Sequence, residues 1–236
     1  MDIAEILLRR SVPVVINSFN QHYYLENIVN RFLAAGFLNI VIFDNRSTYP
    51  PLLAYLKKIR EDQRVLPIYY PENFGPHYFF HKHVFKLLGD IPFLYTDPDL
   101  DWDTLADNFL LRLFELGRKY KIAKVGTALT LPTPETIKPE LPQHISYGKG
   151  YTLSEWEGRY WTEELEPGVY KADIDTTLHL FNPAYLSGDQ TFFTALRVAG
   201  PGFEVKHLPW FNNDPCPEDE RVFYSGLEKF SNWIKT

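Results

Sequence analysis

The first 130 residues alternate short apolar runs with segments in which apolar residues recur every three or four positions. The runs are rich in Val, Ile and Phe, and polar residues or glycines bound them, which is typical of buried strands. Five strands are therefore expected, at residues 12–16, 39–43, 65–70, 91–96 and 122–129. Because strands that alternate with helices pair in parallel, the pattern predicts an α/β fold with helices on both faces of a mostly parallel sheet.

The segments between the apolar runs have the spacing of amphipathic helices. Helices are expected at residues 21–35, at residues 50–59 behind paired prolines, and at residues 75–88. A fourth helix is expected to begin near Thr104, because Thr104 and Asp107 resemble a capping box ahead of a further apolar stripe.

The pattern changes after Leu131, where prolines and glycines dominate about forty positions, and loops of that length usually serve a function. Residues 168–182 then alternate apolar and polar side chains, which predicts a strand with Asp173 and Asp175 on one polar face. We expect a single domain over residues 1–236, with a regular half at 1–130 and a mixed half with a long loop at 131–236.

Charge and cysteine content narrow the possible functions. The 24 Lys and Arg residues against 30 Asp and Glu give a net charge of −6, and no basic run is present, so a nucleic-acid partner is not expected. The single cysteine excludes an intramolecular disulfide and suits a reducing compartment. No apolar run reaches about 18 residues, so we expect a soluble cytoplasmic protein without a transmembrane segment, with peripheral membrane contact left open.

The most informative motif is FLYTDPDLD at residues 93–101, where a predicted strand ends at Asp97 and Asp99. Carboxylates this close repel each other unless a cation lies between them. Mg²⁺ and Mn²⁺ prefer oxygen ligands and commonly bind one or two carboxylates together with phosphate oxygens. The alternative is that these acids cap the following helix, a role for which Asp103 is well suited.

Four stretches of the first hundred residues, taken in order, resemble the family 2 glycosyltransferases and their relatives with the GT-A fold. They are VINSFN at 15–20, IFDNRST at 42–48, PENFGPHYFF at 71–80, and the D-x-D strand FLYTDPDLD at 93–101. The resemblance implies a metal-dependent transfer of a sugar from a nucleotide-sugar donor to a carbohydrate or lipid-linked acceptor, and on family grounds it favours a UDP-sugar as the donor. It also implies that residues 1–130 bind the nucleotide and residues 131–236 bind the acceptor.

The resemblance also assigns residues to the donor and to the metal ion. The residues expected around the nucleotide come from all four stretches: Asn17, Ser18, Phe19, Asp44, Asn73, Gly75 and Asp97. Mn²⁺ or Mg²⁺ is expected on Asp97 and Asp99, with Asp99 the direct ligand. VKHLPW at 205–210 resembles a late motif of many GT-A enzymes, which makes His207 the candidate third ligand, with a packing role as the alternative.

The second half offers three candidates for the general base that takes the proton of the acceptor hydroxyl, namely Asp175, Asp173 and Glu164. Asp175 is favoured, because an ordered strand holds a base in place better than a loop does. The alternative for Asp173 and Asp175 is a solvated strand face. Trp156 and Tyr160, in the long loop, suit stacking on an acceptor sugar or, alternatively, anchoring of the loop to the core.

Two other function classes remain open on sequence grounds. Phosphatases of the haloacid dehalogenase type also place a D-x-D after an apolar strand, but this motif follows three strand–helix units and Asp101 occupies a position that is usually Thr or Val there. The other alternative is a non-catalytic sugar-binding relative that keeps the fold without turnover.

Overall fold

The structure is a computed structural model that describes residues 1–102, 104–139, 141, 150–188 and 190–227. Its strands are β1 Val14–Ser18, β2 Ile40–Asp44, β3 Val65–Tyr69, β4 Phe93–Thr96, β5 Leu100–Asp101, β6 Lys124–Leu129, β7 Glu164–Glu166, β8 Val169–Lys171, β9 His179–Phe181, β10 Leu196–Val198 and β11 Glu204–His207. Its α-helices are α1 Ile3–Ser11, α2 His22–Ala34, α3 Pro50–Ile59, α4 Tyr78–His81, α5 Phe109–Tyr120, α6 Leu153–Gly158 and α7 Glu218–Leu227. Its 3₁₀ helices are η1 Val84–Leu88, η2 Arg159–Trp161, η3 Pro183–Tyr185 and η4 Leu208–Trp210.

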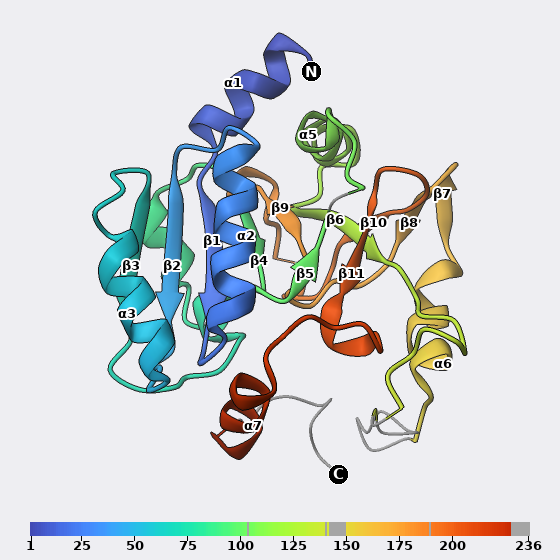
Figure 1. Ribbon diagram of the computed structural model, residues 1–236. Coiled ribbons are helices and arrows are strands. Elements are labelled where there is room, and N and C mark those ends of the chain that lie inside the picture. Colours follow the sequence, from blue (N-terminus) through green and yellow to red (C-terminus); the bar gives the residue numbers. More distant parts are fainter. Residues whose placement is uncertain (103, 140, 142–149, 189, 228–236) are drawn as a thin grey trace.

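One large sheet runs through the molecule in the order β3-β2-β1-β4-β9-β6-β10-β8-β7 (Figure 1). The pairs β3–β2, β2–β1 and β1–β4 are parallel, whereas β9 lies antiparallel between β4 and β6. The five predicted strands are present as β1, β2, β3, β4 and β6, so the α/β class with a mostly parallel first half and a mixed second half is confirmed.

Alternating residues of the strands bury two separate apolar faces. Val14 and Ile16 of β1 pack into a core with the apolar sides of α2, α3 and α5. Val15, between them, points the other way into an aromatic cluster that includes Phe79 of α4 and Phe85 of η1. Helices therefore cover both faces, as expected for a sheet whose parallel strands are buried on both sides.

Two helix predictions need correction, one for a break inside the helix and one for its starting residue. The helix expected at residues 75–88 is broken into α4 and η1, because His83 adopts a left-handed conformation with φ of +55°. The helix expected from Thr104 begins only at Phe109, with Asn108 before it, so Thr104 and Asp107 do not form its cap. Asp103 lies outside the described residues.

The continuous strand predicted at residues 168–182 is wrong. Its ends form β8 and β9, which pair with different strands. β8 pairs with β10, whereas β9 pairs with β4 and β6. Residues 172–178 between them form an irregular loop. This loop crosses close to β6 at Gly126, where an added Cβ would lie 2.6 Å from the Leu178 carbonyl oxygen. Long-range strand pairing has overridden the local alternation of the sequence.

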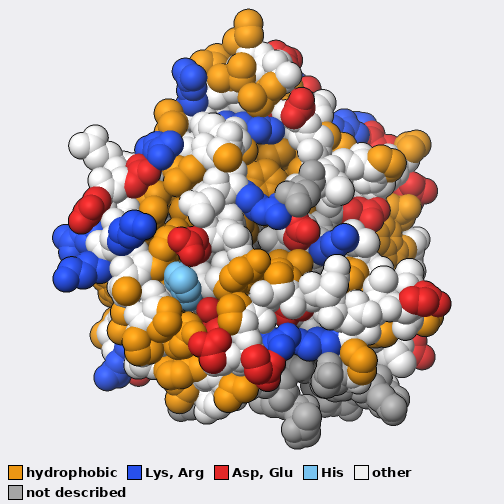
Figure 2. Space-filling model, in the orientation of Figure 1, with side chains coloured by type: hydrophobic (Ala, Val, Ile, Leu, Met, Phe, Trp, Pro, Cys, Tyr) orange, Lys and Arg blue, Asp and Glu red, His pale blue; other side chains and the backbone are white. Residues whose placement is uncertain are grey.

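The surface in the orientation of Figure 1 carries Lys and Arg side chains interspersed with Asp and Glu (Figure 2). Apolar side chains gather at its top, over α1, where Ile3 and Leu7 are exposed. No helix in the described ranges has both the length and the apolar character needed to cross a membrane.

Candidate active site

A cavity of about 510 Å³ lies at the carboxyl ends of β1, β2 and β4, where parallel sheets collect ligand groups. Most of the predicted site residues line it together: Asn17, Phe19, Asn73, Gly75, Asp97, Asp99, Asp173, Asp175 and His207. Trp156 of α6 and Tyr160 of η2, which come from the predicted long loop, also line it. The structure thus brings the first-half motifs and the second-half acids to one place.

Asp97 lies directly after β4 and is half-buried at the cavity wall. Burial first, and the neighbouring Asp99 carboxylate second, raise the pKa of Asp97 well above its usual range. The hydroxyl of Thr176 hydrogen-bonds the Asp97 carboxylate and partly opposes this shift. A cation placed beside Asp97 would favour its ionised form.

The side chain of Asp99 pairs with that of His207, and the short pairing of strands β5 and β11 brings the two together. β5 follows Asp99 and pairs antiparallel with β11, which sets His207 opposite Leu100 and brings its Nε2 to 3.2 Å from Asp99 Oδ2. Burial opposes ionisation of Asp99, but the charge and hydrogen bond of His207, together with hydrogen bonds from the Asp99 backbone and Gln21, lower the pKa of the Asp99 carboxyl. Asp99 Oδ1 is buried and receives no hydrogen bond from any other residue in the described ranges.

The donors at the cavity partly fit a divalent cation. In the part of the chain that the structure describes, no three His, Cys, Asp or Glu side chains converge closely enough to hold a metal ion. Asp99 turns Oδ2 toward His207, whereas Asp97 is bonded to Thr176, so the three predicted ligands do not form a preassembled set. The buried free oxygen of Asp99 is nevertheless a hard donor, and a bound diphosphate would supply the further oxygens that Mg²⁺ or Mn²⁺ needs.

Asp175 is paired across the cavity with a residue that the sequence did not single out as its partner. His77 Nε2 lies 2.6 Å from Asp175 Oδ1, and both side chains line the cavity. His77 follows the Asn73–Gly75 segment after β3, and its position in the Asn-x-Gly stretch was the only sequence signal for it. An imidazole at this distance orients a carboxylate by hydrogen bonding.

Three predicted site residues do not line the cavity. Asp44 is buried, and its carboxylate accepts hydrogen bonds from the backbone N–H and the hydroxyl of Ser47, so it shapes the turn after β2. Ser18 is buried in β1, and Glu164 is exposed on β7, where it accepts a hydrogen bond from the Gly168 N–H. Asn45, the residue after Asp44, does line the cavity, although the sequence did not single it out.

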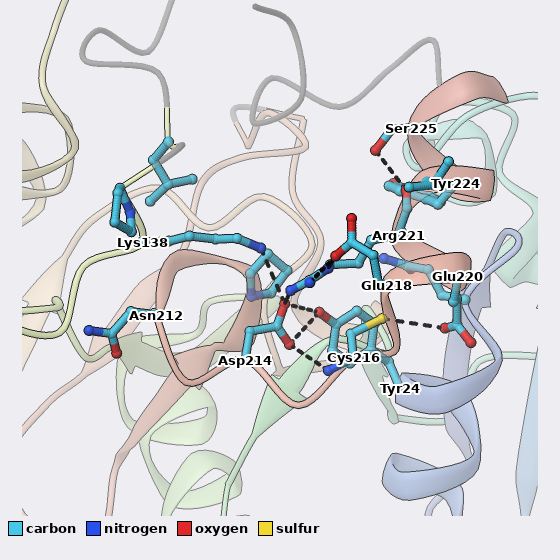
Figure 3. Close-up of a pocket in the computed structure, with 15 residues that line it drawn as sticks. Tyr24, Lys138, Asn212, Asp214, Cys216, Glu218, Glu220, Arg221, Tyr224 and Ser225 are labelled. Carbon is cyan, nitrogen blue, oxygen red and sulfur yellow. Dashed lines mark hydrogen bonds and ion pairs between the residues drawn. The ribbon is translucent and has the colours of Figure 1, made fainter.

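A second cavity, of about 620 Å³, lies next to the first, and Gln21 and Tyr224 line both. Figure 3 shows Tyr24, Lys138 and Arg221 directed toward the buried carboxylate of Asp214. The Tyr24 hydroxyl is 2.7 Å from Asp214 Oδ1, and the Lys138 Nζ is 3.6 Å from Asp214 Oδ2. The acid at the centre of this cavity is therefore fully engaged by the chain itself.

Comparisons with known proteins gave structural similarity without sequence similarity. No protein-family model matches the chain, and no curated protein matches it. Mannosyltransferase PcManGT from Pyrobaculum calidifontis, in complex with GDP-Man and Mn²⁺, is similar with a TM-score of 0.49 and 12% identity, over 91% of this chain and 59% of that chain.

Two further solved structures are similar at the same level. GalNAc-T7 with UDP, GalNAc and Mn²⁺ has a TM-score of 0.48 and 15% identity, over 84% of this chain and 44% of that chain. TarS 1–349 from S. aureus has a TM-score of 0.46 and 12% identity, over 83% of this chain and 59% of that chain. This chain therefore spans 44 to 59% of the length of the three solved structures.

Proposed function

We propose that this chain is a metal-dependent glycosyltransferase that moves a sugar from a nucleotide-sugar donor, a UDP-sugar in the first instance, to an acceptor hydroxyl. The observation that carries the proposal is the convergence of Asp97, Asp99 and Asp175 in one cavity at the carboxyl edge of the sheet. In this proposal residues 1–130 hold the donor and residues 131–236 hold the acceptor, which is a carbohydrate or a lipid-linked molecule.

The donor half of the cavity offers contacts that suit a nucleotide. Phe19 supplies an aromatic face for a base, and Asn17, Asn45 and Asn73 supply amides that hydrogen-bond a base or a ribose. Asp99, with its free oxygen, and His207 would hold Mn²⁺ or Mg²⁺ against the diphosphate, with Asp97 beside them. When bound, the ion would stabilise the negative charge that develops on the departing diphosphate.

The acceptor half of the cavity offers a base. The transfer forms a bond between the acceptor oxygen and the anomeric carbon and breaks the bond from that carbon to the diphosphate. His77 hydrogen-bonds Asp175 Oδ1, which leaves Oδ2 to take the acceptor proton. Trp156 and Tyr160 line the same cavity as Asp175 and suit packing against a sugar ring.

The proposal is tested with the purified chain, Mn²⁺ and a panel of nucleotide sugars, by measuring nucleoside diphosphate release and the binding of UDP with and without EDTA. Release or tight binding that requires the metal is expected. Hydrolysis of p-nitrophenyl phosphate without nucleotide preference would instead indicate the phosphatase alternative. Sugar binding without turnover, unchanged in Asp99→Ala, would indicate the non-catalytic alternative.

A further inference from the structure

The loop at residues 172–178 supplies four residues of the cavity wall, yet it has no regular secondary structure. Asp173, Asp175, Thr176 and Thr177 all line the cavity. Within the described residues, two hydrogen bonds from its N–H groups tie its first part to the neighbouring chain, from Ala172 to the Ala195 carbonyl and from Ile174 to the Phe193 carbonyl. Something else must fix the side of the loop that carries the acids.

Two buried cationic side chains bond three consecutive carbonyl groups of this loop. Arg197 Nε donates to the Asp173 carbonyl at 2.8 Å. Lys124 Nζ donates to the Ile174 carbonyl at 3.1 Å and to the Asp175 carbonyl at 3.3 Å. The carbonyls of residues 173, 174 and 175 thus all accept hydrogen bonds from side chains of β6 and β10.

Lys124 is an unusual residue for the first position of a central strand. It is only 1% exposed, and its Nζ lies 3.8 Å from the centroid of the Phe192 ring. Burial lowers the pKa of Lys124 to about 7, although Asp175 and Asp173 oppose this shift. Removing an amine from water is unfavourable, so the two carbonyl bonds and the ring contact are what offset its burial here.

Arg197 ties the same loop to α6 and η2, which also line the cavity. It is 4% exposed, and its Nη1 lies 2.7 Å from Glu157 Oε2 of α6. Its guanidinium group lies 3.8 Å from the centroid of the Tyr160 ring. One side chain therefore links the loop that carries Asp175 to the aromatic wall that would face the acceptor.

We propose that Lys124 and Arg197 are positioning residues that hold residues 173–175 in the one conformation in which Asp175 meets His77 at the cavity. This inference rests on the proposed function, because it assigns these residues to the acceptor side of that reaction. Neither residue needs to touch a substrate. Both act through the backbone of the loop.

The structure supplies a matched control for Arg197. Arg9 of α1 is also buried, bonds the carboxylate of Glu5 at 2.7 Å and donates to the carbonyls of Ala35 and Asp107. It also lies against aromatic rings, those of Phe37 and Phe109, but it lines none of the described cavities. Arg9→Lys and Arg197→Lys therefore make the same chemical change, one away from the loop and one at it.

The test compares Arg197→Lys, Lys124→Met and Arg9→Lys by hydrogen exchange and by turnover of the best donor from a UDP-sugar panel. In Arg197→Lys and Lys124→Met, peptides covering residues 172–178 should exchange roughly tenfold faster or more than in the parent chain. Their kcat should fall roughly 100-fold, with the donor KM within about twofold, because misplacement of a base costs chemistry and not donor binding. Arg9→Lys should change neither quantity.

Unchanged exchange in residues 172–178 of both loop variants would overturn the inference, as would an equal fall of kcat in Arg197→Lys and Arg9→Lys. Lys124→Met keeps the test open if Arg197→Lys does not fold. If the parent chain turned over no UDP-sugar, the proposed function would fail at that step, and the exchange comparison would still decide whether the two cations hold the loop.

Discussion

The two neighbouring cavities each contain a buried aspartate, and the two aspartates differ in how their oxygens are used. In the cavity at the strand ends, Asp99 leaves Oδ1 without a hydrogen bond from another described residue. In the second cavity, Asp214 accepts bonds from the Tyr24 hydroxyl and the Cys216 N–H and lies near Lys138 and Arg221. A buried acceptor without a donor is unfavourable, whereas a fully bonded one stabilises the fold.

This contrast separates a site that needs a ligand from a site that is complete in the folded chain. Substitutions of acids in the first cavity should therefore reduce binding or turnover with little loss of stability. Substitutions in the second cavity should reduce stability with little direct effect on the reaction. Binding sites commonly have lower stability than they could have, because groups arranged for a ligand are not arranged for each other.

The largest expected effect is on turnover in Asp175→Asn, which keeps the hydrogen bond acceptor for His77 but removes the base. Transfer should fall about 10³-fold, while UDP binding in the presence of Mn²⁺ stays within about twofold. Steady-state kinetics and calorimetry measure the two quantities. Glu164→Gln is the control, because Glu164 is exposed on β7 outside the cavity. Equal losses in both variants would mean that Asp175 is not the base.

The next largest effect is expected on nucleotide binding in Asp99→Asn. Removal of the charge and of one hard oxygen should weaken Mn²⁺-supported UDP binding by more than about 100-fold, since even residues behind the ligands of a metal site cost 10–100-fold. Asp101→Asn is the control, because Asp101 lies two residues after Asp99 but does not line the cavity. Its Oδ1 instead pairs with Arg31 Nη1 at 2.9 Å. A dissociation constant that Asp99→Asn leaves unchanged would remove the metal assignment.

A smaller effect, on stability alone, is expected in Asp214→Asn. The variant weakens charged hydrogen bonds with Tyr24 and leaves Lys138 without its carboxylate, so the free energy of unfolding should fall by about 2 kcal/mol. Urea denaturation measures the change, and UDP binding serves as the functional readout. Loss of UDP binding in a variant that remains folded would show that the second cavity takes part in donor binding.

A further effect is expected in the pH dependence of stability, from Glu220 of α7. Burial raises the pKa of Glu220 to about 7, although the Tyr23 N–H hydrogen bond opposes this shift. Between about pH 4.5 and pH 7 the folded chain then keeps a proton that the unfolded chain releases, so this residue makes stability fall as pH rises through that interval. Glu220→Gln should remove that part of the fall.

Urea denaturation of the parent chain and of Glu220→Gln at pH 5 and pH 8 checks this expectation. The stability of the variant relative to the parent should be higher at pH 8 than at pH 5. An equal difference at the two pH values would show that Glu220 ionises in the folded chain as it does in the unfolded one.

Local sequence patterns were sufficient for the five predicted strands of the first half and for helices α2 and α3. Apolar runs such as residues 91–96 became strands, because a buried parallel strand needs nothing more specific than β-branched and aromatic side chains on both faces. The same topology placed Asn17, Asn73 and Asp97 at one edge, since the carboxyl ends of parallel strands meet there. These outcomes follow from short-range periodicity and from one rule of sheet geometry.

Contacts between distant parts of the chain were beyond such patterns. His77 and Asp175, 98 residues apart, form a pair, and β11 brings His207 to Asp99. Residues 172–178 alternate like a strand but form a loop, in which the carbonyls of residues 173–175 bond Lys124 and Arg197. Periodicity records which side of an element is apolar, but it carries no information about which distant group will satisfy a given backbone carbonyl. Only the packing of the whole chain provides that partner.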